Sequence, residues 1–381
     1  MPRHLLALLL VFTLAAAGHP AAAQSLTLVH TFRHLTVSTL IFSPDGRTLA
    51  TAGGEWATPD CVRLWSVASG KLLHTLRDSR DDWEIGSVTF SADGKTLAYS
   101  CDDEVRLWDV RTGRLLHVFS GDLVGQILIS PHQRLLVGGS DMDESGTYSA
   151  VQIWDLRTGR RRVLPRSRGV SEVAFSRDGQ QIVGINSEYS SPRRPFERVW
   201  DAATGKVIRT RYLPLRTLVF ALSLDQEYFV STEWDEANNP LSVWDGRIGQ
   251  RVAVLPIHFA EMPAAALSSR IPWLAIGGKE LTLWNWREKR CLFTGRTLSS
   301  EVSSVTFSPD GTYLAAGSED GTIRLWAVSY SCGTAGAAGT SGGAIRLRRM
   351  GAGETNRGQQ GAGVGALSGV SVRCSASQVT V

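Results

Sequence analysis

Tryptophan recurs along this chain at a nearly constant interval. The spacing between successive members of the series is 40 to 46 residues, and the series comprises Trp65, Trp108, Trp154, Trp200, Trp244, Trp284 and Trp326. Periods of this length are typical of repeat proteins, in which each repeat is one supersecondary unit that buries its apolar face against its neighbours. The period therefore predicts seven equivalent units.

Each repeat has the pattern of four short strands joined by tight turns. In the second repeat, the apolar stretch Ser87–Ser91 leads into an Asp-Gly turn, a second strand "KTLAYS", a third strand Val105–Asp109 and then "RTGR" and "LLHVF". Asp-Gly and Thr-Gly pairs suit hairpin turns, because glycine adopts a positive φ without a Cβ clash. The repeat tryptophan would fill the gap between neighbouring sheets. The aspartate after the tryptophan would accept backbone N–H bonds in the following turn, and this role is expected for Asp109, Asp155, Asp201 and Asp245.

Two stretches, "SPDG…DGTIRLW" (Ser308–Trp326) and "LWDVRTGRLLH" (Leu107–His117), resemble WD-repeat sequences. The resemblance covers about residues 26–330, and it implies an all-β fold, a seven-bladed β-propeller of four-stranded antiparallel blades. The last repeat has no outer strand after Trp326, whereas "LTLVHTF" (Leu26–Phe32) matches the outer strands of other repeats. We therefore expect the N-terminal strand to complete blade 7 and close the ring, which removes exposed sheet edges.

The segments on either side of the repeats differ from them in composition. Residues 1–23 combine a basic start, an apolar run and small residues before Gln24, the layout of a secretory signal peptide. A membrane anchor needs about 20 apolar residues, and this run is shorter. We expect an exported protein, periplasmic or extracellular, with a propeller at residues 24–330. Residues 331–381 are rich in Gly, Ala and Ser, basic and without aromatic residues, which predicts a disordered tail.

Signals for catalysis are weak. "GTSGG" around Ser341 fits a nucleophile pattern but lies in the tail, outside any strand and helix. His30, His74 and His117 occupy one position in consecutive outer strands, so we expect them to be spread around the rim as a repeat feature. The inner strands show no ring of metal-binding residues, and five scattered cysteines without a CxxC motif indicate neither a disulfide framework nor a zinc site. We expect no enzyme activity and no cofactor.

The repeat is irregular between its second and third strands. Eighteen residues separate Leu136 from Trp154 in blade 3 and Ile182 from Trp200 in blade 4, against eleven in blade 2. The long loops of blades 3 to 5 should stand side by side on one face, and they contain aromatic and arginine side chains typical of recognition surfaces. We expect a protein-interaction scaffold whose partner-binding residues are Tyr148, Tyr189, Arg193, Arg194, Phe196 and Trp234, with Trp56 on the blade 1 loop.

Two alternatives stay open from the residues themselves. "DMDESG" places side-chain oxygens of Asp141, Asp143 and Ser145 around a glycine turn, as Ca²⁺ requires. A solvated acidic loop is the favoured interpretation, and calcium-dependent adhesion is the alternative. The "WDAATGK" turn at Trp200–Lys206 also resembles turns of quinoprotein propellers, which implies a propeller enzyme or a ligand- or cofactor-binding protein as a second alternative.

The charge of the chain is concentrated in one sector. Residues 157–216 hold 14 basic and 5 acidic residues, which would steer an acidic protein or an envelope polyanion toward this sector. Arg160, Arg161 and Arg162 follow the third strand and should lie away from the long loops. No nucleic-acid motif and no membrane span are evident, and we expect a monomeric propeller.

Overall fold

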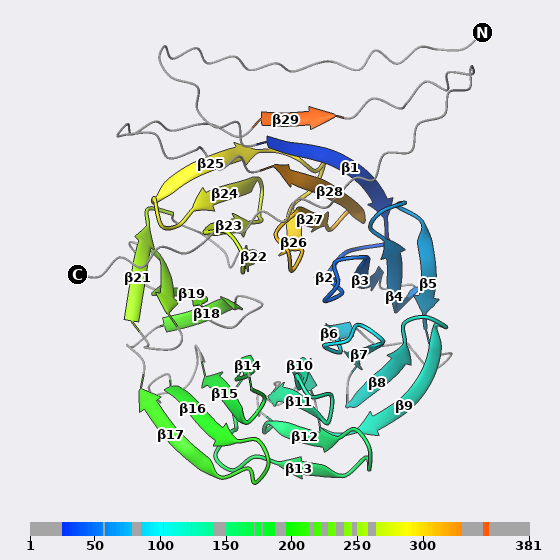
Figure 1. Ribbon diagram of the computed structural model, residues 1–381, viewed down its shortest axis with the longest axis vertical. Helices are drawn as coiled ribbons and strands as arrows, with labels where there is room; N and C mark the ends of the chain where they lie inside the picture. Colours follow the sequence, from blue (N-terminus) through cyan, green and yellow to red (C-terminus); the bar gives the residue numbers. More distant parts are fainter. Residues whose placement is uncertain are drawn as a thin grey trace, which may run out of the picture. The chain divides into compact units, whose positions relative to one another are not determined.

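The computed structural model describes residues 25–329 and 346–349, apart from 56–57, 78–84, 102, 123, 141–148, 171, 177, 187–195, 213–216, 223–227, 234–239, 246–249 and 258–263. Within these residues the chain is all-β and forms seven antiparallel sheets, the blades, around a central axis (Figure 1). The seven-bladed propeller predicted from the tryptophan period is confirmed. No helix in this described part is long and apolar enough to cross a membrane.

Each blade has an inner, a second, a third and an outer strand. Blade 1 comprises β2 (Thr39–Phe42), β3 (Thr48–Glu55), β4 (Thr58–Ser66) and β5 (Leu72–Leu76), and blade 2 comprises β6 (Ile85–Phe90), β7 (Thr96–Cys101), β8 (Glu104–Asp109) and β9 (Arg114–Ser120). Blade 3 comprises β10 (Val124–Ile129), β11 (Leu135–Ser140), β12 (Gln152–Asp155) and β13 (Arg161–Val163), and blade 4 comprises β14 (Glu172–Phe175), β15 (Gln181–Asn186), β16 (Phe196–Asp201) and β17 (Val207–Tyr212).

The remaining blades follow the same order. Blade 5 comprises β18 (Thr217–Leu222), β19 (Tyr228–Glu233), β20 (Leu241–Asp245) and β21 (Gln250–Leu255), and blade 6 comprises β22 (Ala265–Leu267), β23 (Trp273–Ile276), β24 (Leu281–Asn285) and β25 (Arg290–Gly295). Blade 7 comprises β26 (Val302–Phe307), β27 (Tyr313–Ser318), β28 (Thr322–Ser329) and β1 (Ser25–Arg33), with the short β29 (Arg346–Arg349) beside β1.

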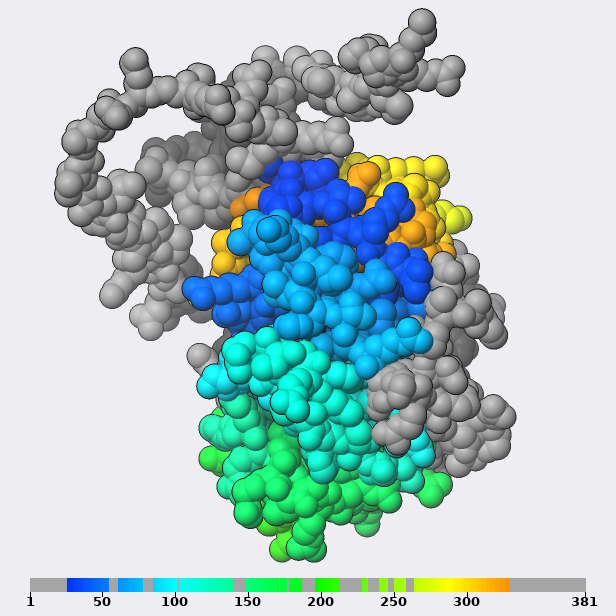
Figure 2. Space-filling model, turned by 90° about the vertical axis from the view of Figure 1, so that its right-hand side faces the viewer, coloured from blue at the N-terminus to red at the C-terminus, as the bar shows by residue number. Residues whose placement is uncertain are grey.

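The antiparallel order of the strands gives the propeller two different faces. The turns between the inner and second strands and between the third and outer strands lie at the same end of each blade, which we call the turn face. The connections between the second and third strands lie at the opposite end with the links between blades, and we call this the loop face. Figure 2 shows the rim of the ring, where blade 1 in blue packs directly against blade 2 in cyan.

The hydrophobic core lies between adjacent blades. One cluster combines Val137 and Ile153 of blade 3 with Phe175 and Trp200 of blade 4. The indole Nε1 of Trp200 donates to Pro165 O at 3.0 Å, just beyond the outer strand of the preceding blade. Trp154 does the same toward blade 2, where its Nε1 donates to Ser120 O at 3.1 Å. In these blades the tryptophan therefore fills the gap between neighbours with its ring, as predicted, and its polar atom is satisfied there.

The predicted turn chemistry is confirmed where the turns are described. Asp109 accepts from Thr112 N at 2.7 Å, Asp155 from Thr158 N at 2.8 Å and Asp201 from Thr204 N at 2.6 Å. Gly113, Gly159 and Gly205 have φ between 66° and 73° in these turns. Asp245 ends β20, and its turn lies outside the described residues.

Pairing between the two ends of the repeat region closes the ring. β1 pairs antiparallel with β28 from Ser25↔Ser329 to Arg33↔Thr322, so the N-terminal strand completes blade 7 as predicted. Leu26 and Phe32 of β1 are buried in separate core clusters of blade 7. Residues 346–349 of the predicted tail form β29, which pairs parallel with β1. The rest of the tail lies outside the described residues.

The junction between blades 7 and 1 yields a stability prediction. Gly321 and Gly46 both have a positive φ, +76° and +69°. A Cβ on Gly46 would meet no atom within 4 Å, whereas one on Gly321 would lie 2.1 Å from His34 O and 2.2 Å from Leu35 O. We expect Gly46→Ala to cost about 1 kcal/mol from backbone strain alone, and Gly321→Ala to cost roughly 3 kcal/mol because main chain must also move. Denaturant unfolding measures both, and equal losses would contradict the tight junction.

A second set of contacts joins neighbouring inner strands. Ser87 Oγ accepts from Ile127 N of the next blade at 3.2 Å, Gln126 Oε1 from Val173 N at 2.7 Å and Ser304 Oγ from Leu40 N at 3.1 Å. Glu172 occupies the same position of the repeat in blade 4. Within the described part of the chain, the carboxyl group of Glu172 makes no hydrogen bond. The residue keeps some solvent contact. Burial nevertheless raises the pKa of Glu172 to about 7.

This raised pKa predicts a pH-dependent cost. The folded state holds the Glu172 proton from the ordinary pKa of 4.5 up to about 7, so the free energy of unfolding falls as the pH rises through that window. Glu172→Gln removes the charge and supplies the amide that Gln126 uses in blade 3. We expect the variant to melt at a higher temperature than the wild type at pH 8 and at a nearly equal temperature at pH 4, as measured by calorimetry. A gain of the same size at both pH values would show that the charge of Glu172 is not the cause.

Candidate functional site

The predicted recognition loops leave the propeller from three adjacent blades on the loop face. The last paired residues below them are Gly138↔Gln152 in blade 3, Asn186↔Phe196 in blade 4 and Thr232↔Leu241 in blade 5. In blade 2 the equivalent pair, Cys101↔Glu104, leaves only a two-residue turn. The three loops therefore share one face and three neighbouring positions.

Most of the predicted contact residues lie in the loops themselves. These residues fall outside the described part of the chain: Tyr148, Tyr189, Arg193, Arg194 and Trp234, together with Trp56 and the calcium candidates Asp141, Asp143 and Ser145. In blade 1, β3 and β4 stay paired as far as Glu55↔Thr58, so the extra residues there lengthen a hairpin.

Phe196 corrects the prediction. It is the first residue of β16, its side chain is only 8% exposed, and it belongs to the core cluster with Leu164 and Val170. The guanidinium of Arg198 lies 4.3 Å above its ring. Phe196 was predicted as a contact because it follows Pro195 in an irregular segment, but sheet pairing begins at this residue, so its side chain enters the core.

A buried ion pair beneath the blade 4 loop was missed from the sequence. The Glu197 side chain is 5% exposed, and its two oxygens accept from Arg209 at 2.7 Å and Arg211 at 2.6 Å. The ion pair could have been predicted from the register of the hairpin, which places Glu197 opposite Arg211. That register becomes visible only once the two strands are aligned. The pair fixes the base of the loop and neutralises part of the basic sector.

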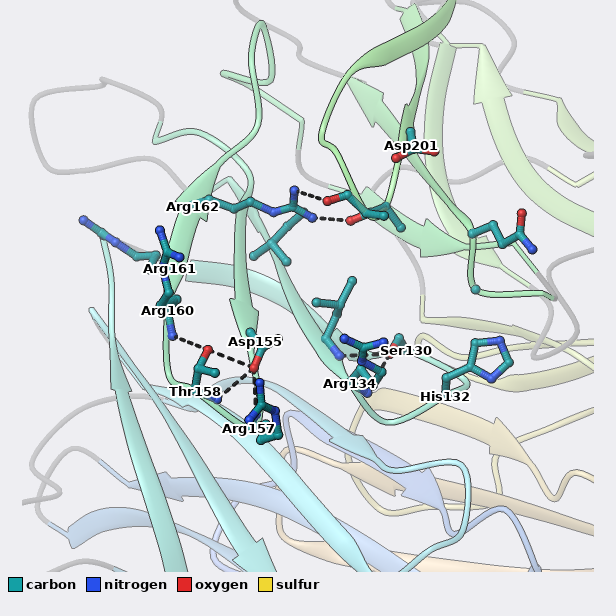
Figure 3. A pocket seen from close by; sticks show the side chains of 16 residues that line it. Ser130, His132, Arg134, Asp155, Arg157, Thr158, Arg160, Arg161, Arg162 and Asp201 are labelled. Carbon is teal, nitrogen blue, oxygen red and sulfur yellow. Dashed lines mark hydrogen bonds between the residues drawn. The ribbon is translucent and has the colours of Figure 1, made fainter.

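Four other basic residues of this sector, Arg157, Arg160, Arg161 and Arg162, line a cleft on the turn face. The cleft lies between blades 3 and 4 and has a volume of about 770 Å³. Figure 3 shows Arg157 and Arg160 on the turn that follows β12, Arg161 and Arg162 at the start of β13, and Arg134 and His132 on the turn after β10. The prediction that Arg160, Arg161 and Arg162 lie away from the long loops is confirmed.

In blades 7, 1 and 3 a side chain at one position of the outer strand contacts the next blade. His74 and His117 pair with the residue that precedes the repeat tryptophan, and His74 Nε2 lies 3.0 Å from Arg111 O in the next blade's turn. His30 makes the same contact with Ala68 O at 3.3 Å. These histidines are spread around the rim, as predicted. In blade 3 the position holds Arg162, which donates to Ala203 O at 2.7 Å and to Ala202 O.

Two carboxylates in the cleft are held by their own turns. Asp155 accepts from Thr158 N and from Thr158 Oγ1 at 2.9 Å, and Asp201 accepts from Thr204 N and from Thr204 Oγ1 at 2.7 Å. These hydrogen bonds hold the pKa of both aspartates below the usual range. Both carboxylates therefore stay ionised, and the five arginines of the lining leave the cleft with a net positive charge.

No metal-binding arrangement is seen where the structure describes side chains, since no three His, Cys, Asp or Glu residues gather there. Cys61 and Cys101 are buried thiols, and Cys61 Sγ lies 3.8 Å from His34 Nε2. The sequence left a bond between these two cysteines open, and the structure shows none. Ser341 lies outside the described residues.

Sequence comparison finds known repeats in three parts of the chain. The family model "WD domain, G-beta repeat" matches residues 26–66, 70–109 and 289–327. A periodic tryptophan protein 2 homolog of Dictyostelium discoideum is 34% identical over 65 residues, which is 16% of this chain and 7% of that protein. The serine-threonine kinase receptor-associated protein of Rattus norvegicus is 36% identical over 85 residues, 20% of this chain and 23% of that protein. The chain thus matches less than a quarter of the length of these relatives.

Structural comparison extends the similarity to the whole ring. The hydrazine synthase of Kuenenia stuttgartiensis has a chain that aligns with a TM-score of 0.63 and 18% identity, covering 78% of this chain and 96% of that one. At this identity the similarity concerns the fold alone. Together with seven four-stranded blades closed by β1, the repeat matches support a place for the chain in the WD-repeat family.

Proposed function

We propose that the protein is an exported, non-catalytic scaffold that binds a partner protein through the loop face of blades 3, 4 and 5. The observation that carries the proposal is the position of the three loop bases, which are adjacent and on one face, whereas blade 2 has a two-residue turn there. Blade 1 also has extra residues here, but its strands stay paired as far as Glu55↔Thr58, so the long connections beyond the paired strands gather in blades 3 to 5, as a localised binding surface requires.

The described residues beneath these loops form a rigid base. Glu197 is held by two arginines, and Asn186 Nδ2 donates to Gly169 O at 2.5 Å. In blade 3, Gln152 is fully buried, and its Oε1 accepts from Asp122 N at 3.0 Å. A rigid base reduces the conformational entropy lost when the loops bind a partner.

The loop sequences supply the contact chemistry. Tyr148, Tyr189 and Trp234 offer large amphipathic surfaces, and Arg193 and Arg194 offer oriented hydrogen-bond donors. Phe196 is left out of the proposed surface because it belongs to the core. Trp56 is retained only as a peripheral contact from blade 1.

The export part of the proposal rests on residues 1–23 and has its own test. We expect the mature protein to begin at Gln24 and to be recovered from the periplasm or the medium of the native host. N-terminal sequencing of the protein from each cell fraction measures this. An uncleaved chain confined to the cytoplasm would contradict the proposal.

The binding part is tested with a loop-shortened variant. Residues 141–148 and 188–194 are replaced by short Gly-Asn turns, which leaves Phe196 and Glu197 in place and should preserve the melting temperature. Crosslinking in the envelope fraction of the host identifies proteins held by the wild type, and the dissociation constant of each is then measured with purified components. We expect the variant to bind at least about thirtyfold more weakly, the loss of about 2 kcal/mol typical of central contact residues.

A matched control uses the opposite face. Arg111→Gln/Arg114→Gln changes two exposed arginines in the turn of blade 2, so its affinity for the same partner should equal that of the wild type. If the loop-shortened variant also retains wild-type affinity, the loops do not form the binding surface.

A further inference from the structure

The geometry points to a second binding site, on the turn face and independent of the long loops. We propose that the cleft between blades 3 and 4 binds an acidic peptide segment of a partner protein, with Arg134, Arg157 and Arg160 contacting its carboxylates. The cleft is lined by turns of the two blades (Figure 3). None of the residues that form it belongs to the loop face.

Two of the five arginines in the cleft have structural roles. Arg162 binds the carbonyl oxygens of the next blade, and Arg161 Nη1 donates to Gln152 Oε1 at 2.8 Å and lies 3.4 Å from Asp122. The guanidinium groups of Arg134, Arg157 and Arg160 have no hydrogen bond or ion pair within the described residues, and all three side chains are exposed. Three cations therefore remain available to a ligand.

A departure from the repeat explains why Arg134 is available. Blades 1, 2, 4 and 7 have an aspartate in the turn between their inner and second strands, and in blade 2 Asp93 lies 3.4 Å from Lys95. In blade 3 that position holds His132, whose Nε2 lies 2.8 Å from Asp178 O. Arg134, the counterpart of Lys95, has thus lost the carboxylate that the repeat normally places beside it.

The backbone of the cleft favours separate carboxylates over one compact phosphate. Phosphate sites commonly use backbone N–H groups that converge on the anion. In this cleft the N–H groups of the turn glycines already donate to carbonyl oxygens of their own turns. Gly159 N donates to Asp155 O and Gly205 N to Asp201 O, both at 2.8 Å, and Gly179 N donates to Ser176 O at 2.7 Å. Guanidinium groups are the donors left.

The floor of the cleft also fits a peptide. Leu135, Ile153 and Ala202 line it beneath the arginines. The aliphatic stems of glutamate side chains can contact this apolar floor while their carboxylates reach guanidinium groups, which bind carboxylates in a bidentate geometry. An extended segment with several acidic residues satisfies both features.

The test uses the full chain and a fluorescein-labelled hexaglutamate peptide, with binding measured by fluorescence anisotropy at low and physiological salt. Arg157→Gln/Arg160→Gln is compared with Arg111→Gln/Arg114→Gln, which removes the same charges from the same turn positions of blade 2, outside the cleft. We expect about tenfold weaker binding for the cleft variant, from the loss of two charge-assisted contacts, and less than about twofold change for the control.

A third variant restores the repeat. His132→Asp returns the aspartate found in the other blades, so it should pair with Arg134 and weaken hexaglutamate binding while the turn remains intact. Equal losses in the cleft and blade 2 variants would show nonspecific attraction and overturn the proposal. Stronger competition by tripolyphosphate than by unlabelled hexaglutamate at equal concentration would overturn it as well, because the cleft would then be a phosphate site.

Discussion

The pairing of β1 with β28 is the interaction on which the rest of the structure depends. Blades 1 to 6 are each built from one continuous segment, whereas blade 7 joins residues 25–33 to residues 302–329. Leu26 lies in the cluster shared with blade 6, and Phe32 lies in the cluster shared with blade 1. Both interfaces of blade 7 therefore depend on the N-terminal strand, and the closed ring in turn sets the positions of all other blades.

Blade 3 departs from the repeat on both faces of the propeller. It has His132 in place of a turn aspartate, Arg162 where blades 7, 1 and 2 have a histidine, and one of the long loops. The first two changes lie on the turn face and leave an unneutralised basic cleft beside blade 4, and the loop lies on the opposite face. A regular scaffold tolerates such changes because each blade contacts mainly its two neighbours, so binding properties can differ between blades without altering the fold.

The architecture could be predicted from the sequence because its signals are local and repeated seven times. The tryptophan near the end of the third strand recurs in all seven blades, and the aspartate and glycine of the following turn, Asp201 and Gly205 in blade 4, recur in blades 2 and 3. The sites were harder to predict. Phe196 enters the core because strand pairing starts one residue after Pro195, and nothing in the local sequence marks that boundary. The cleft could not be predicted because it forms only when turns of two blades come together. One sign of it was visible in the sequence, since Arg162 stands where blades 7, 1 and 2 have a histidine.

Ring closure can be measured by hydrogen exchange of the native protein, followed by mass spectrometry of peptides from β28. If β1 covers this strand, the amides of Thr322–Ser329 should exchange as slowly as those of Glu104–Asp109, the equivalent strand of blade 2, because both have partners on either side. Rapid exchange in β28 with continued protection of β8 would show an open edge at blade 7 and contradict the closed propeller.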